Sequence, residues 1–189
     1  MIKKKKIFFL VTEDWYFLSH RLNLAVYLKK KGYEIHVCCK DTGCITDILS
    51  KGIIYHELII RRKSLSIIHF FSEALNVNSV IKKVKPDIIH LISVRPIVIG
   101  FLIATFYRKI MVCCTFTGLG SLFLSKHIFK KTLVHIIQIF LIITYRLNST
   151  KIIVQNKDDV NYVSKFLSID KKEIILIKGS GINTKLFNF

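Results

Sequence analysis

Short apolar runs alternate with longer helical patterns along this chain, and that alternation is the strongest constraint on its fold. Seven runs are rich in β-branched residues, and several are apolar almost throughout, as expected of parallel strands buried on both faces. The alternation predicts βαβ units in a Rossmann-like, doubly wound, mostly parallel sheet of about seven strands with helices on both faces. The expected strands are 7–12, 34–39, 53–58, 87–92, 110–115, 151–155 and 174–177, and the expected helices are 17–31, 68–84, 97–106, 129–147 and 157–167.

Residues that favour helix ends support these boundaries. Gly32 follows the first helical pattern, and Pro86 ends the second just before a strand. Asn156 is placed as the N-cap of the last helix, with Asp158 and Asp159 in its first turn. The sequence contains no internal repeat or low-complexity linker, so residues 1–189 are expected to form one domain.

Composition limits the class of protein and of partner. A hydrophobic content of 51% over 189 residues excludes a disordered chain. The 30 basic and 12 acidic residues give a net charge of +18, which favours an anionic partner such as nucleic acid, phospholipid or a phosphorylated substrate. The same excess of Lys is also explained by the base composition of a genome. The apolar stretches 96–107 and 132–145 are shorter than the roughly 18 residues of a membrane span.

The cysteines and histidines show no metal or disulfide pattern. Five cysteines without a CxxC pair fit a reducing cytoplasm, and the acidic Glu13 and Asp14 interrupt the first apolar run too early for a signal peptide. The seven histidines lack metal-binding spacing, so no metal site is expected. His36, His56 and His90 lie in strand patterns and are interpreted as core or edge residues.

Ligands of an open α/β sheet bind beyond the carboxyl ends of its strands, where the loops 13–20, 94–100 and 115–121 are expected. The first loop has Glu13 and Asp14 in place of the G-x-G-x-x-G that cradles a pyrophosphate. Two carboxylates at a helix start repel phosphate, which argues against a nicotinamide dinucleotide site. Both residues also have a simple interpretation as helix-start residues that complement the helix dipole.

Four motifs in order carry a resemblance to a known family. Residues 12–25 match T-E-D-x-x-F-x-S-H-R-x-x-L-A, residues 115–120 are T-F-T-G-L-G, residues 155–159 are Q-N-K-D-D, and residues 179–187 are G-S-G-I-N-T-K-L-F. Together they resemble the first half of family 4 glycosyltransferases of the two-domain GT-B type. The subgroup that they resemble is bacterial and builds lipid-linked oligosaccharides and surface polysaccharides.

The resemblance implies the acceptor-binding half of an enzyme that moves a sugar from a nucleotide-sugar donor to a lipid-linked or saccharide acceptor. It implies no metal and no other cofactor, and a cytoplasmic location, peripheral at the inner face of the membrane. The sequence stops soon after its last motif, so the donor-binding domain is expected to be absent and the chain inactive alone. A truncated gene, an excised fragment and one half of a split enzyme all remain open.

The resemblance also suggests site residues, although no catalytic residue is assigned. Glu13 and Asp14 are expected to bond sugar hydroxyls, and Arg21 either contacts a phosphate of the acceptor or is a solvated helix residue. These side chains are expected to be partly exposed and to converge on one edge of the sheet. The predicted acceptor-binding residues are Glu13, Asp14, His20, Arg21, Arg95, Thr117 and Gly118, and the predicted interdomain loop is Gly179, Ser180 and Gly181.

Two alternatives remain at this point. One is a non-catalytic subunit that binds acceptor or membrane and is completed by a separate donor-binding partner; the Lys-rich start of the 129–147 helix and the net charge favour an anionic membrane surface. The other is a basic nucleic-acid-binding module, which only the charge supports. No specific nucleic acid is therefore expected as a partner.

Overall fold

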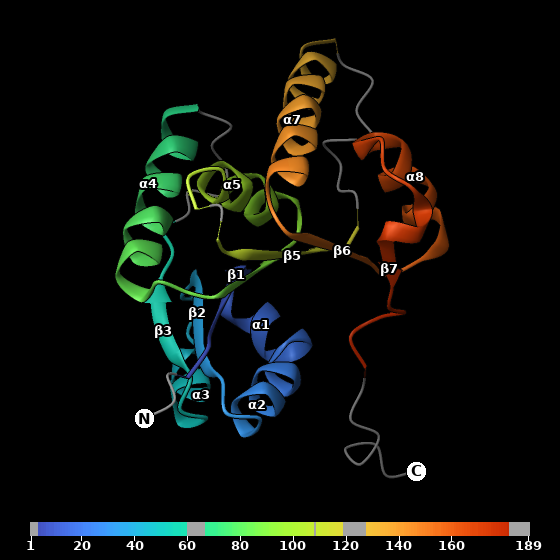
Figure 1. The fold of residues 1–189 in the computed structure, drawn as a ribbon. Coiled ribbons are helices and arrows are strands. Elements are labelled where there is room, and N and C mark those ends of the chain that lie inside the picture. The colour runs from blue at the N-terminus through green and yellow to red at the C-terminus, as the bar shows by residue number, and fades with distance from the viewer. Residues whose placement is uncertain (1–3, 60–66, 108, 119–127, 182–189) are drawn as a thin grey trace.

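One seven-stranded parallel sheet organises the protein. The computed structural model describes residues 4–59, 67–107, 109–118 and 128–181. The strands lie in the order β3-β2-β1-β4-β5-β6-β7, and every neighbouring pair is parallel (Figure 1). The predicted fold class and all seven predicted strands are confirmed. The strands are β1 (Lys6–Glu13), β2 (Glu34–Lys40), β3 (Ile54–Glu57), β4 (Ile88–Ile92), β5 (Met111–Phe116), β6 (Thr150–Val154) and β7 (Ile174–Leu176).

The helices confirm the predicted pattern with three differences. The single helix expected over 17–31 is two helices that meet at Arg21, whose backbone leaves the helical region (φ −129°, ψ −14°). The helix expected from 97 already begins at Val94, because Pro96 is tolerated in a first helical turn. Helix α3 and the 3₁₀ turn η1 were not expected. The helices are α1 (Asp14–His20), α2 (Leu22–Lys30), α3 (Ile45–Ser50), α4 (Ile67–Val84), α5 (Val94–Ala104), α7 (Ile128–Leu147), α8 (Lys157–Leu167) and η1 (Lys171–Glu173).

The predicted helix ends are confirmed. Asn156 caps α8, since its side chain accepts a 2.7 Å hydrogen bond from the Asp159 N–H. Gly32 follows the end of α2 with φ +93°, a conformation that costs glycine little. Helix α4 ends at Val84, two residues before Pro86. Local sequence signals therefore fix where these helices stop.

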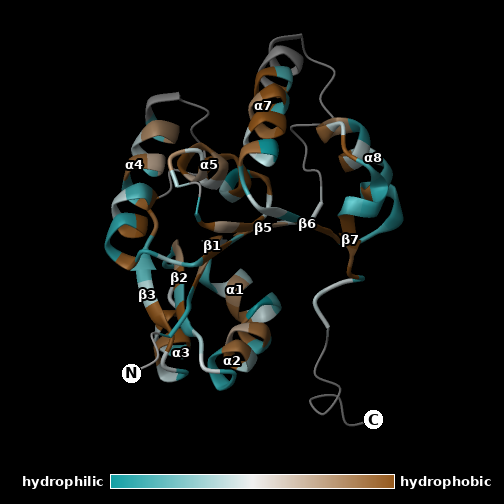
Figure 2. Ribbon diagram, viewed as in Figure 1, coloured by the Kyte–Doolittle hydropathy of each residue, from teal (hydrophilic) through white to brown (hydrophobic). Residues whose placement is uncertain are grey.

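Two hydrophobic cores lie on opposite faces of the sheet. One core joins α4, α5, α7 and α8 to the sheet, and the other joins α1, α2 and α3 to strands β1 to β4. Figure 2 shows the strands largely in the hydrophobic colours between these two layers. Gly100 lets α5 lie close to β4, because a Cβ at this position would collide with the Leu91 side chain. No helix in the described residues is long and apolar enough to cross a membrane.

Candidate functional site

Three strand ends meet where the order of strands reverses. Strand β1 ends at Glu13, β4 ends just before Ser93, and β5 ends just before Thr117. Because β1 and β4 are neighbours whose following helices α1 and α5 lie on opposite faces, this is the switch point at which open α/β sheets bind ligands. The Ser93 N–H donates to the Thr115 carbonyl at 3.0 Å and joins the residue after β4 to the end of β5.

Asp14 is buried and holds the loop before α3. Its carboxylate accepts hydrogen bonds from the N–H groups of Thr42 (2.9 Å), Cys44 (2.9 Å) and Trp15 (2.7 Å), and from the Thr42 hydroxyl. Burial opposes ionisation, but these hydrogen bonds outweigh it and lower the pKa of Asp14 to about 2. The expectation of a partly exposed Asp14 is therefore wrong, because the carboxylate turns toward backbone N–H groups of the neighbouring loop.

Glu13 ends β1, and the residues expected as the first loop form helix α1 instead, which carries the rings of Trp15, Tyr16 and His20. Glu13 is buried and accepts a 2.7 Å hydrogen bond from the indole Nε1 of Trp15, whose side chain is 47% exposed. Trp15 meets Tyr16 edge-on, and Tyr16 stacks on His20 with ring centroids 4.3 Å apart. The expected partial exposure is thus confirmed for His20 and wrong for Glu13. We call Trp15, Tyr16 and His20 the aromatic platform.

Arg21 connects the beginning and the end of the described chain. Its Nη1 donates to the His20 carbonyl at 3.1 Å and to Ser180 Oγ at 3.3 Å, across 159 positions of sequence. The side chain is only 7% exposed, so its predicted partial exposure is also wrong, and burial lowers the pKa of Arg21. The non-helical backbone at Arg21 separates α1 from α2 at this residue. The structure therefore brings Arg21 and the Gly179–Gly181 loop into one place.

Arg95 and the β5 loop occupy the rest of the edge. The Arg95 guanidinium binds the buried Glu73 carboxylate with two hydrogen bonds, from Nε at 2.9 Å and from Nη2 at 2.7 Å. Thr117 is half-buried and Gly118 is exposed, with φ +132°. Residues 119–121, the remainder of the expected third loop, lie outside the described residues. Within the described chain, no hydrogen bond joins Arg21 or Arg95 to Thr117.

Two further residues near this edge were not among the predicted site residues, and one of them, His90, was interpreted as a core or edge residue. His90 is buried, contacts the Thr115 hydroxyl at 2.8 Å, and has its pKa lowered to about 3 by burial and by the charge of Arg21. Ser93 has φ +76° and ψ 164°, a strained backbone conformation for any residue except glycine. The sequence does not show which side chains will surround a histidine in a strand. It also does not show that a serine will adopt a positive φ.

Cys113, which interacts with the charge of Arg21, does not supply a nucleophile at neutral pH. Burial raises the pKa of Cys113 to about 11, although the Arg21 charge acts in the opposite direction. Among the described residues, no group of three or more His, Cys, Asp or Glu is placed to hold a metal ion. The described side chains at this edge thus offer hydrogen-bonding groups, the guanidinium groups of Arg21 and Arg95, and an aromatic surface.

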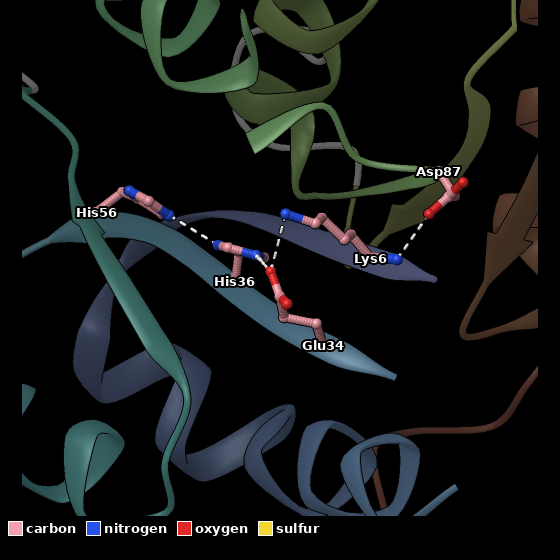
Figure 3. Close-up of polar contacts among 5 residues, drawn as sticks. All are labelled: Lys6, Glu34, His36, His56 and Asp87. Carbon is pink, nitrogen blue, oxygen red and sulfur yellow. Dashed lines mark hydrogen bonds and ion pairs between the residues drawn. The ribbon is translucent and has the colours of Figure 1, made fainter. Parts of the chain in front are cut away.

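A separate polar cluster lies on β1, β2 and β3, near the opposite end of the sheet. Figure 3 shows the Lys6 ammonium 3.0 Å from Glu34, the Glu34 carboxylate 2.8 Å from His36 Nε2, and His36 Nδ1 3.0 Å from His56 Nε2. The Lys6 N–H donates to Asp87 at 2.7 Å. Burial lowers the pKa of both His36 and His56, the Glu34 carboxylate opposing this for His36. Every residue of this amino-end cluster has a partner inside it.

The parallel, doubly wound sheet and its polar carboxyl edge place the chain in the class of open α/β domains, whose ligands typically bind beyond the strand ends. Within this class, the chain belongs to the glycosyl transferase 4-like family, whose model matches residues 6–156. A search of curated proteins gives no significant match.

Solved structures agree with this assignment at the level of the fold. A glycosyltransferase from Rickettsia africae superposes with a TM-score of 0.68 at 20% identity, over 97% of this chain and 45% of that one. A UDP-GlcNAc 2-epimerase from Neisseria meningitidis superposes with a TM-score of 0.62 at 17% identity, over 93% of this chain and 47% of that one. MurG from Acinetobacter baumannii superposes with a TM-score of 0.55 at 13% identity, over 95% of this chain and 46% of that one. The chain thus spans about half the length of these proteins. The prediction of a family 4-like chain equivalent to one half of a GT-B glycosyltransferase is confirmed.

Proposed function

We propose that this chain is the acceptor-binding half of a glycosyltransferase that transfers a sugar from a nucleotide-sugar donor to a lipid-linked or saccharide acceptor. The family match over residues 6–156 is the observation that carries this proposal. The carboxyl edge supports it, because sugar binding needs an apolar ring face beside groups that bond hydroxyls. The aromatic platform and the Glu13 carboxylate that bonds Trp15 supply both.

The predicted site residues take different parts in this proposal. Glu13 and His20 contact the saccharide, and the Gly179–Gly181 loop lies at the boundary with a donor-binding half. Asp14 fixes the loop before α3, and its direct contact with acceptor stays a prediction, as do the contacts of Arg95, Thr117 and Gly118. The subgroup that builds lipid-linked oligosaccharides and surface polysaccharides, resembled by residues 12–25, is the expected source of the acceptor.

Trp15 provides a direct test of acceptor binding, since it is the only tryptophan in the chain and donates to Glu13. Its fluorescence is expected to change saturably on titration with one or more of a panel of hexoses, N-acetylhexosamines and their disaccharides. Glu13→Gln should weaken that binding roughly tenfold, because a charged hydrogen bond contributes about 1.5–3 kcal/mol. Glu57→Gln, an exposed change on β3, is the matched control. Equal binding by Glu13→Gln, or no response to any sugar, would contradict the proposal.

Catalysis by the 189-residue chain alone is not expected, because it spans about half the length of the matched enzymes. Incubation with radiolabelled nucleotide sugars should give no transfer and no hydrolysis. Calorimetry with UDP should detect no micromolar binding, because donor contacts are assigned to the other half. Turnover by the purified chain would place a donor site on this domain and end the half-enzyme proposal.

A peripheral position at the inner face of the cytoplasmic membrane is part of the proposal. Helix α7 carries an exposed apolar row at Ile136, Ile139, Ile143 and Leu147, spaced as one helix face. An apolar helix face on a chain with net charge +18 suits an anionic lipid surface. Sedimentation with vesicles containing phosphatidylglycerol should fall with salt and with the double change Ile139→Asp and Ile143→Asp. Binding to random DNA in place of vesicles would favour the nucleic-acid alternative.

A further inference from the structure

Arg21 and Arg95 both lie at the carboxyl edge, but they differ in whether the Nε and Nη2 atoms of the guanidinium have hydrogen-bond partners. The Nε and Nη2 atoms of an arginine form a fork that fits two oxygens of a carboxylate or a phosphate. In Arg95 this fork is filled, because Nε and Nη2 each donate to one oxygen of Glu73, at 2.9 and 2.7 Å. Arg95 therefore shows what an arginine fork with both donors bonded looks like in this protein, and Arg21 can be compared with it.

The fork of Arg21 has no such occupant. Within the described chain, the hydrogen bonds of its guanidinium come from Nη1, to the His20 carbonyl and to Ser180 Oγ. Nε is buried without a hydrogen-bond partner. Nη2 makes no hydrogen bond with the described residues and is not among their buried unpaired atoms, so it reaches the surface.

Among the described residues, no carboxylate forms an ion pair with Arg21. All 12 acidic residues lie within the described ranges, and the ion pairs found there are Lys6–Glu34, His36–Glu34 and Arg95–Glu73. Two groups that interact with the Arg21 charge are neutral at pH 7, since burial keeps His90 unprotonated and Cys113 a thiol. A buried charge without a partner is costly, several kcal/mol in typical proteins. Such a group is retained where a ligand completes it.

We propose that the Nε–Nη2 fork of Arg21 is the receptor for a phosphate group of the ligand bound at this edge. A phosphate fits better than a carboxylate because it has three oxygens for three donors: Nε, Nη2 and the hydroxyl of Ser180, which lies 3.3 Å from Nη1. The Gly179–Gly181 loop therefore belongs to the receptor through Ser180. Only the identity of the ligand rests on the proposed function, according to which this phosphate belongs to the acceptor.

The test measures anion binding by the 189-residue chain, without any sugar transfer. Calorimetric titration with inorganic pyrophosphate and inorganic phosphate should show saturable binding, and acetate should bind more weakly. Geranyl diphosphate tests whether a lipid-linked diphosphate is preferred over the free anion. Arg21→Gln should weaken pyrophosphate binding at least about tenfold, and Arg21→Lys should recover only part, because an ammonium has no planar fork. Arg146→Gln, which removes an exposed guanidinium of α7, controls for the loss of one charge.

The outcomes separate this inference from the proposed function. Equal weakening by Arg21→Gln and Arg146→Gln, or no saturable binding by the unchanged chain, overturns the receptor, because binding would then follow net charge alone. Far-UV circular dichroism of each variant shows whether the domain is folded, and Arg21→Lys serves if Arg21→Gln is not. Saccharide binding at Trp15 is measured independently, so failure of one experiment leaves the other result standing.

Discussion

The two ends of the sheet differ in whether their polar and charged groups have partners. In the amino-end cluster, Lys6, Glu34, His36 and His56 form a closed chain of contacts (Figure 3). At the carboxyl edge, Arg21 is buried without a counter-ion in the described chain and Ser93 has a positive φ. Stability favours the first arrangement, and binding sites commonly keep the second at a cost in stability. The comparison therefore indicates which end of the sheet serves a ligand.

The largest expected effect contrasts the two arginines. Arg95→Met should lower the free energy of unfolding by about 3 kcal/mol, because it removes the two hydrogen bonds that Arg95 makes to the buried Glu73. Arg21→Met should raise it by about 1 kcal/mol, since an unpaired buried charge is replaced by an apolar side chain of similar length. Urea denaturation measures both. A loss of stability in Arg21→Met as large as in Arg95→Met would show that Arg21 is structural.

The next effect is a pH dependence at His90. Its pKa is about 3 in the folded chain against 6.5 for the free side chain, so between these values only the unfolded state binds the proton. Folding stability attributable to His90 is complete above pH 6.5 and declines as the pH falls, by about 2 kcal/mol at pH 5. His90→Gln should flatten the decline between pH 7 and 5, leaving the part due to His36 and His56, whose pKa values are also lowered.

His135→Gln, which replaces an exposed histidine of α7, controls for the substitution itself. Urea midpoints at pH 7, 6 and 5 for the three proteins give the comparison. Parallel curves for His90→Gln and the unchanged chain would show that His90 gains its proton without unfolding.

A smaller effect tests the strained loop. Ser93→Gly should stabilise the protein by about 1 kcal/mol, because glycine adopts φ +76° and ψ 164° without the steric cost that serine bears. Ser168→Gly is a matched change at another positive φ (+53°), in the ordinary left-handed region, and should gain less. Thermal melts compare the two. Equal gains would mean that strain is not concentrated at the carboxyl edge.

The smallest effect belongs to the amino-end cluster. Glu34→Gln should cost about 0.5 kcal/mol at pH 7, because its ion pair with Lys6 is partly exposed. Glu34 has a lowered pKa from its hydrogen bonds to His36 and Lys6, so this contribution is present above pH 4.5 and is lost as the pH falls below it. Neither saccharide nor pyrophosphate binding should change. A change in saccharide or pyrophosphate binding caused by Glu34→Gln would contradict the proposal that only the carboxyl edge of the sheet binds ligand.

Much of the fold was predictable because local patterns and topology agree. Apolar runs located every strand, and Gly32, Asn156 and Pro86 located helix ends from chemistry confined to a few neighbouring residues. Helix α3 was missed because six residues give little periodicity. The break at Arg21 was missed because neither glycine nor proline occurs there to mark it in the sequence.

The site was predictable in place but not in detail. Topology brought Glu13, Arg21 and the Gly179–Gly181 loop to one edge, as parallel strands require. The exposure of Glu13, Asp14 and Arg21 was predicted wrongly, because charged side chains in a segment expected to be a loop are ordinarily exposed to solvent. The burial of Asp14 arises from the N–H groups of Thr42 and Cys44, about thirty positions away. Long-range partners of this kind leave no trace in the local pattern.

The strand order also has a consequence for synthesis of the chain. Strand β1 is made first and lies inside the sheet, and the Lys6 N–H meets its partner Asp87 only 81 residues later. Until then, one edge of an almost wholly apolar strand stays open on the ribosome, which is the situation in which nascent chains aggregate. The sequence has lysines at positions 3–6, of which Lys6 is the first residue of that strand, and charged residues at a strand end discourage edge-to-edge pairing. We expect this run of lysines to reduce aggregation of the emerging central strand.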